Sequence, residues 1–331
     1  MSTPLKQQDF LCVSSYIRAL ESRLLTEADL TRMVDAPATG DALRVLQEHG
    51  YPAMEENAAS IAHALKEEQS RLFEDLDGFQ MDSRVFDFFR IRQDYHNAKV
   101  LLKSAAAKTD ASHLLLHGGR IPEEELTRII QEGDEQRLPE KMETAVTAAR
   151  QTLASTGDAQ KSDFILDRAF YAEVLSLAES TENAFLIGYV RLMIDSDNAK
   201  ALIRSLKMMK GAELFADAVV EGGTVDAVTL LAAAENGAVT EPFSGSALAG
   251  AIETIAPVIY SGSLTAFERT CDDVMTEYLQ GAALVPYGIE PVVAYIAVKQ
   301  REIQNVRIIM NGRLAGLSPK TMRERMRMSY V

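Results

Sequence analysis

The chain has 331 residues, 47% of them hydrophobic, which is enough material for a sizeable core and for two or three domains of about 100 to 200 residues each. Its net charge of -14 disfavours general nucleic-acid binding, which depends on neutralising phosphates, and direct adsorption to anionic lipid. Two cysteines and no apolar run near the ~18 residues of a membrane span predict a protein of a reducing cytosol, either soluble or held at a membrane by other proteins.

The first element expected along the chain is a short helix over residues 24–33. Thr26 and Asp29 have the spacing of a capping arrangement at a helix start. Further along the chain, Gly50, followed by Tyr51 and Pro52, is a plausible end for the helical sequence that precedes it.

A long helix is predicted around the hexapeptide Asp94-Tyr95-His96-Asn97-Ala98-Lys99. The pattern is an acid, two residues, an asparagine, one residue and a cation. An apolar stripe at three- and four-residue steps contains Phe88, Ile91, Tyr95, Ala98 and Leu102. Gly118-Gly119 then predicts a turn, because glycine readily adopts positive φ. A second short helix follows over 121–129, where Pro122 and three glutamates suit a first helical turn.

The same order returns in the middle of the chain. Asp195-Ser196-Asp197-Asn198-Ala199-Lys200 repeats the pattern, and Gly222-Gly223 repeats the turn. The stripe of this second long helix contains Phe185, Tyr189, Leu192, Ala199, Ile203 and Leu206. Leu230 follows the second glycine by seven residues, as Leu126 does in the first copy. Residues 235–246, rich in glycine and small polar residues, predict a loop.

The third copy is Glu302-Ile303-Gln304-Asn305-Val306-Arg307. Its helix is apolar nearly all round, with Val293, Ala297 and Ile309 off the main stripe, and is therefore predicted to lie in the interior. Ser318-Pro319 looks like one more helix start.

The three hexapeptides are separated by 101 and 107 residues, which indicates one helical unit used three times. We predict an all-α protein of three similar modules, spanning residues 1–121, 122–222 and 223–331, the last with a basic C-terminal helix. The hexapeptides are expected to fasten the modules to one another through side-chain hydrogen bonds. The residues with this role are Asp94, Asn97, Lys99, Asp195, Asn198, Lys200, Glu302, Asn305 and Arg307.

Positive charge is concentrated at the end of the sequence. Residues 299–331 carry +6, whereas the rest of the chain carries -20. This asymmetry suggests an electrostatic docking surface on a partner. Its candidate residues are Arg313, Lys320, Arg323, Arg325 and Arg327. The alternative is that these side chains pair with carboxylates of the same protein.

No pattern points firmly to catalysis or to a cofactor. There is no phosphate-binding glycine loop and no local grouping of Ser, Cys and His. His113 and His117 could share a helix face, but no carboxylate or cysteine completes a metal site nearby. Asp272-Asp273 with Glu277 resembles the magnesium-binding runs of all-helical prenyl-transfer enzymes, although its spacing is off by one and a second acidic run is missing. Such an enzyme is one alternative for this chain, and a helical scaffold protein that lacks catalysis is another.

The ordered set of segments resembles the C subunit of prokaryotic V/A-type ATPases, whose eukaryotic equivalent is called d. The resemblance runs nearly end to end. It is carried by the opening Tyr16-Ile17-Arg18-Ala19-Leu20-Glu21-Ser22-Arg23-Leu24-Leu25-Thr26, the repeated Asp-x-x-Asn-x-Lys helices, and Pro291-Val292-Val293-Ala294-Tyr295-Ile296 through Asn305-Val306-Arg307-Ile308-Ile309.

The resemblance implies a non-catalytic rotor part without a cofactor. Members of this family are similar to funnels of three helical modules around a pseudo-threefold axis, with a central cavity. They sit on the cytoplasmic face of the plasma membrane, bound to the proteolipid ring, and receive the end of the central stalk. The expected function is to transmit torque between stalk and ring during ATP-driven proton or sodium transport or during ATP synthesis, with no membrane span of its own.

Overall fold

The computed structural model describes residues 5–79, 81–209 and 211–331. Over these ranges all regular secondary structure is helical, so the prediction of an all-α fold is confirmed. None of the helices in the same ranges combines the length and the apolar character that crossing a bilayer requires.

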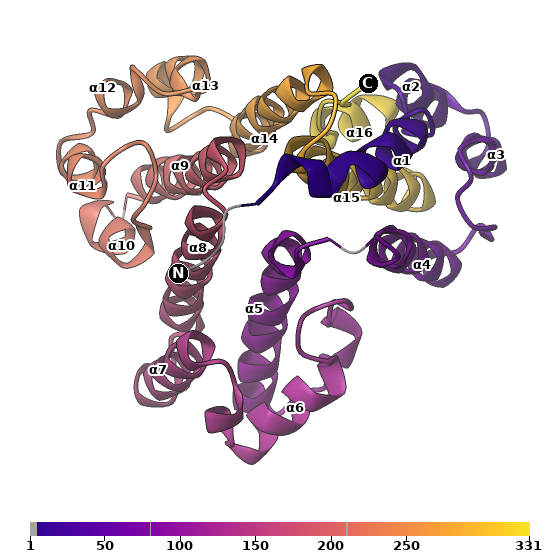
Figure 1. Ribbon diagram of the computed structural model, residues 1–331. Helices are drawn as coiled ribbons and strands as arrows, with labels where there is room; N and C mark the ends of the chain where they lie inside the picture. The colour runs from indigo at the N-terminus through magenta and orange to yellow at the C-terminus, as the bar shows by residue number, and fades with distance from the viewer. Residues whose placement is uncertain (1–4, 80, 210) are drawn as a thin grey trace. The chain divides into compact units, whose positions relative to one another are not determined.

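The chain divides into two compact units (Figure 1). We call Asp82–Tyr260 the middle unit, and Leu5–Met81 together with Ser261–Val331 the terminal unit. The module boundaries at 121/122 and 222/223 stay a prediction. The first and last parts of the sequence fold together in the terminal unit.

In the middle unit, α8 packs against α5, α7, α9 and α10. The helices of this unit are α5 (Ser83–Ala107), α6 (Glu123–Glu132), α7 (Glu140–Thr156), α8 (Ala159–Ser180), α9 (Ala184–Lys207), α10 (Gly211–Ala218), α11 (Ala227–Asn236), α12 (Thr240–Phe243) and α13 (Ala249–Ile255). Short 3-10 turns lie at Ser112–Leu114, Glu135–Arg137 and Ala256–Val258.

In the terminal unit, α15 contacts α1, α2, α3, α4, α14 and α16. The helices of this unit are α1 (Leu11–Glu21), α2 (Glu27–Asp35), α3 (Thr39–Glu48), α4 (Ala58–Asp77), α14 (Leu264–Gln280), α15 (Ile289–Leu314) and α16 (Pro319–Arg325). Two 3-10 turns lie at Gln7–Phe10 and Gly281–Leu284.

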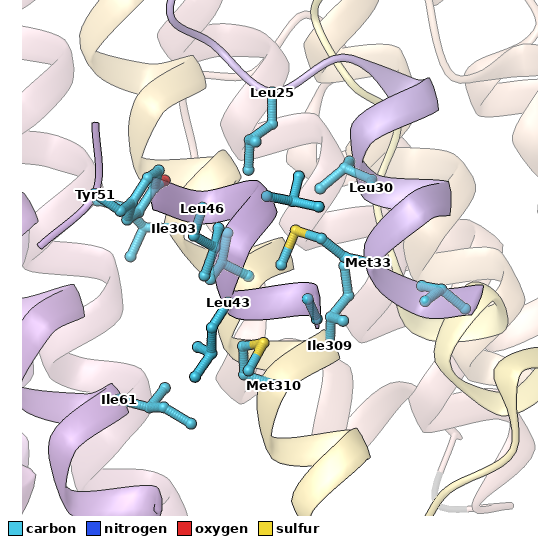
Figure 2. Close-up of a cluster of buried hydrophobic side chains, with 14 of the residues drawn as sticks. Leu25, Leu30, Met33, Leu43, Leu46, Tyr51, Ile61, Ile303, Ile309 and Met310 are labelled. Carbon is cyan, nitrogen blue, oxygen red and sulfur yellow. The ribbon is translucent and has the colours of Figure 1, made fainter. Parts of the chain in front are cut away.

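The core of the terminal unit joins side chains from both parts of the sequence. Figure 2 shows Met33 and Leu46, from the early helices, beside Ile303, Ile309 and Met310 of α15. All five side chains are buried. Burying these side chains removes apolar surface from water and so holds α2 and α3 to α15. The stabilisation is ~25 cal/mol per Å² of apolar surface buried.

Helix ends follow the sequence signals. Thr26 and Asp29 form a full capping box at the start of α2, and Pro122 lies just before α6. Gly50 has φ +81° just beyond α3. Ser318 caps α16 by accepting the N–H of Thr321. These four predictions are confirmed.

The predicted stripes are buried in α5 and α15 and, except for half-buried Phe185, in α9. Helix α15 is buried on several faces, as its apolar sequence predicted. The loop predicted over 235–246 is only partly right, because α12 forms within it. Pro242 is tolerated there because it falls in the first turn of a helix, where its missing N–H has no intrahelical partner.

Candidate functional site

The three hexapeptides form three structurally similar clamps. In each clamp, the acid and the asparagine of one long helix hydrogen-bond to the backbone of another segment. In the first clamp, Asn97 Nδ2 donates to the carbonyl of Leu116 at 2.7 Å, and the Leu116 N–H donates to Asn97 Oδ1 at 2.8 Å. Asp94 accepts the backbone N–H of Ile121 at 3.2 Å and Nε of Arg120 at 2.8 Å. The loop after α5 is therefore held at two points.

The second clamp repeats this geometry on α9. Asn198 Nδ2 donates to the carbonyl of Val220 at 2.7 Å, and the Val220 N–H donates back to Oδ1 at 2.8 Å. Asp195 accepts the N–H groups of Thr224 and Val225, both at 3.1 Å, and the Thr224 hydroxyl. A threonine here supplies the side-chain donor that Arg120 supplies in the first clamp.

The third clamp, on α15, binds two segments that lie far apart in the sequence. Asn305 exchanges both hydrogen bonds with the backbone of Arg327 at 2.9 Å. Glu302 accepts the N–H of Leu25 at 2.5 Å and the hydroxyl of Tyr51 at 2.6 Å. Leu25 is equivalent to Ile121 and Val225 when the short helices that follow are aligned by their leucines.

The residue two positions before the N–H that the acid binds differs between the two clamps with an aspartate and the clamp with a glutamate. A Cβ on Gly119 would overlap Asp94 Oδ1, and a Cβ on Gly223 would overlap Asp195 Oδ1. The position equivalent to these glycines in the third clamp is Arg23, two residues before Leu25. Glu302 is one methylene longer than aspartate, so its carboxylate can reach the backbone without that close approach.

The long helices also end alike. A residue with φ between 54° and 69° lies eleven residues after each clamp asparagine, at Lys108, Met209 and Gly316. Two of the three are not glycine, so the left-handed conformation carries a cost that the surrounding fold offsets. The repeat therefore includes the ends of the helices as well as the hexapeptides.

The clamps are buried, and this determines their electrostatics. Asp94 and Asp195 are at most 1% exposed. Burial raises the pKa of both carboxyls above the ordinary value, and the hydrogen bonds that they accept oppose the rise. Arg120 bridges Asp94 to Glu173 of α8, whose second oxygen accepts the Tyr95 hydroxyl at 2.9 Å.

The third clamp contains a buried ion network. Lys299 Nζ lies 2.6 Å from Glu302 and 2.9 Å from Glu68 of α4, and it sits over the Tyr51 ring at 4.3 Å. All four side chains are nearly inaccessible to solvent. Burial raises the pKa of Tyr51 well above its ordinary value, so the phenol stays protonated and donates to Glu302.

The cations of the three hexapeptides have different surroundings. Lys99 pairs with Asp167 of α8. Lys200 lies 3.8 Å from Asp197, on its own helix. Arg307 is exposed on α15. The acid and the asparagine therefore carry the common geometry, and the cation does not.

Several basic residues at the end of the sequence have intramolecular partners. Arg313 donates to the carbonyls of Met33, Val34 and Ala36 at the end of α2. Arg323 pairs with Asp35, and Arg327 pairs with Asp272 at 2.6 Å. Lys320 is exposed and lies 4.0 Å from Glu324, and Arg325 is exposed as well. Arg313, Arg323 and Arg327 therefore have partners within the same protein.

One expectation about the candidate metal-binding residues is wrong. Glu123 contacts His117 Nδ1, so a carboxylate does lie nearby, although no group of three possible ligands exists in the described part of the chain. Asp272 and Asp273, the run that resembled a magnesium site, receive Arg327 Nε and the N–H of Met328. They anchor the last residues of the chain to α14.

Sequence reasoning found the clamping side chains but not what they bind. The signal for their partners was present in the glycine pairs. Gly118 and Gly222 do have positive φ, as predicted for turns, but Gly119 and Gly223 are needed for close approach to an aspartate. The role of Leu25 had no local signal.

The fold and the clamps together define a class: an all-α protein whose repeated polar groups are used to hold helices and loops in place. Comparison with known families makes the assignment specific. Residues 13–325 match the model of the ATP synthase (C/AC39) subunit family. The chain belongs to this family, whose members are non-catalytic subunits of rotary ATPase complexes, and the resemblance noted from the sequence is confirmed. The prenyl-transfer alternative is therefore rejected.

Individual relatives are similar to this chain along almost its whole length. The C subunit of the A-type ATP synthase of Haloferax volcanii is 26% identical over 336 residues, covering 93% of this chain and 94% of that protein. The C subunit of the V-type sodium ATPase of Enterococcus hirae is 24% identical, covering 95% and 97%. The C subunit of the V-type ATP synthase of Thermus thermophilus is 25% identical, covering 93% and 94%.

Proposed function

We propose that this chain is the rotor part that couples the central stalk of a V/A-type ATPase to its membrane proteolipid ring. It transmits torque during ATP-driven proton or sodium transport, or during ATP synthesis. It acts on the cytoplasmic face of the plasma membrane as a peripheral part of the complex. The observation that carries the proposal is the family match over residues 13–325.

The arrangement that suits this role is three similar helical modules around a pseudo-threefold axis, forming a funnel with a central cavity. The modules would span residues 1–121, 122–222 and 223–331. Support comes from the threefold recurrence of the clamp and of the left-handed residue after each long helix. Repeated modules of this kind can enclose a cavity while each contacts its neighbours.

Within this proposal the clamps supply stiffness. A coupling part must not yield under torque, and a buried side chain that holds a backbone at two points resists displacement of the segment it binds. Each hydrogen bond contributes about 0.5–1.5 kcal/mol to stability, and more is lost when a buried partner is left unsatisfied.

Co-purification tests the proposed partners. An affinity-tagged full-length chain, expressed in its own cell, should bring down a membrane proteolipid and central-stalk proteins from detergent-solubilised membranes. Recovery of neither would contradict the proposal and favour the helical scaffold. The matched control is a tagged soluble protein of similar charge purified in the same way.

A docking role for the basic residues is best tested away from the internal contacts of Arg313, Arg323 and Arg327. Lys320→Glu with Arg325→Glu changes two exposed charges of α16. The complex should assemble more weakly, and its sensitivity to salt should fall because fewer ion pairs cross the interface. Arg44→Glu on α3, also exposed, is the control. Unchanged assembly and salt dependence would remove α16 from the docking surface.

A further inference from the structure

The third clamp differs from the other two in how its bound segment is made. Asn97 and Asp94 hold Leu116 and Ile121, two points of one continuous loop, and Asn198 and Asp195 hold Val220 and Val225 in the same way. In both loops the two points are five residues apart and joined by the peptide chain. Asn305 and Glu302 instead hold Arg327 and Leu25.

The segment that contains Arg327 is an extended strap over residues 326–330. Its first residue, Met326, is buried in the core of the terminal unit. Beyond it, the Met328 N–H donates to Asp273 Oδ1 at 2.7 Å, and Gln280 Nε2 donates to the carbonyl of Tyr330 at 3.0 Å. The strap is thus attached to α14 as well as to α15.

The strap also reaches the junction between α1 and α2. Ser329 Oγ donates to the carbonyl of Leu25 at 2.8 Å, across 304 residues of sequence. Leu25 is therefore bound on both sides, by Glu302 through its N–H and by Ser329 through its carbonyl. The cavity left between these groups is about 10 Å³, at the limit for one water molecule.

We propose that the strap is a reversible latch, which closes the third clamp by hydrogen bonds where the other two clamps are closed by the chain itself. Its release would free the α1–α2 junction from α14 while the polypeptide stayed intact. The first two clamps cannot open in this manner, because a displaced loop of five residues stays tethered beside its helix. The terminal unit can therefore open locally and close again.

Hydrogen exchange of the full-length protein, followed by mass spectrometry, tests the latch. Asn305→Leu removes both bonds to the Arg327 backbone and should raise exchange in residues 326–330 roughly fivefold to 150-fold, as expected for two hydrogen bonds. The matched control, Asn198→Leu, should raise exchange near Val220 and leave the strap unchanged. A strap that already exchanges at the unprotected rate in the wild type would overturn the proposal.

A second variant guards against a general loss of folding in Asn305→Leu. Asp272→Asn weakens the Arg327 ion pair, at a partly exposed site, and leaves the Asn305 side chain in place. Wild-type strap exchange should rise with salt, because screening weakens that pair, and the variant should show higher exchange with little salt dependence. Opening must also raise exchange at Leu25 and in α2. A strap that opens while α2 stays fully protected would be a passive tail, and the latch would be excluded.

Discussion

At the residue scale, the clamp acid and the residue opposite it are matched in size. Asp94 and Asp195 bind backbone N–H groups because Gly119 and Gly223 let the chain approach, whereas Glu302, one methylene longer, binds the N–H of Leu25, where the equivalent position is Arg23. The matching links two positions more than twenty residues apart in each of the first two clamps.

Gly119→Ala tests this matching. The added methyl group would overlap Asp94 Oδ1, and overpacking of this kind costs about 1–3 kcal/mol. We expect a lower Tm and a lower urea midpoint. Gly250→Ala is the control, since Gly250 lies in α13 with open space around its Cα, and alanine there should be neutral or stabilising by ~0.5–1 kcal/mol. Equal effects of the two substitutions would contradict the matching.

The buried carboxylates predict a dependence of stability on pH. Burial raises the pKa of Asp195 in the folded state above the unfolded value of ~3.9. Its contribution is therefore fully present below about pH 4 and is lost as pH rises through the folded pKa. Asp195→Asn removes this loss, so the stability of the variant relative to wild type should increase with pH over that window, as measured by urea unfolding.

A matched variant separates charge from hydrogen bonding at the same site. Asp195→Ala leaves the N–H groups of Thr224 and Val225 without their acceptor and should cost ~1–3 kcal/mol. If Asp195→Asn instead lost stability relative to wild type as pH rose, the buried charge would be stabilising and the stated direction would be wrong.

At the element scale, helix starts could be predicted because they are written in local residues. Thr26 with Asp29, Pro122, and Ser318 with Pro319 all mark helix starts where expected. The burial of α15 could be predicted too, since apolar residues lie on most of its faces. The turn of helix at α12 was missed because Pro242 and the flanking glycines carry a strong loop signal.

Arg313 shows how a basic residue at the end of the sequence serves another helix. It satisfies carbonyls in the last turn of α2, which have no partner within that helix, and its charge suits the negative end of the helix dipole. Arg313→Gln should cost ~1–3 kcal/mol and raise hydrogen exchange in α2. Arg307→Gln, an exposed change on α15, the helix that also carries Arg313, should change the free energy of unfolding by no more than ~0.5 kcal/mol. A neutral Arg313→Gln would make the residue free for docking instead.

At the scale of the whole molecule, the terminal unit could not have been predicted from sequence patterns. Periodicity and capping report on residues a few positions apart, whereas Leu25 and Glu302 meet across 277 residues. The repeated hexapeptides indicated three similar long helices, but no local signal marked Leu25 as the partner of Glu302. Only the fold reveals that the opening short helix completes the third clamp.

The central claim is that this chain couples two parts of a rotary ATPase and performs no reaction itself. The most direct measurement reconstitutes the complex in vesicles with and without the chain, and records ATP hydrolysis and ion transport together. Without the chain, or with Asn97→Leu and Asn198→Leu combined, hydrolysis by the soluble sector should continue while transport is lost, and wild-type chain should restore transport. Transport at the full rate without the chain, or loss of hydrolysis together with transport in the double variant, would contradict the account.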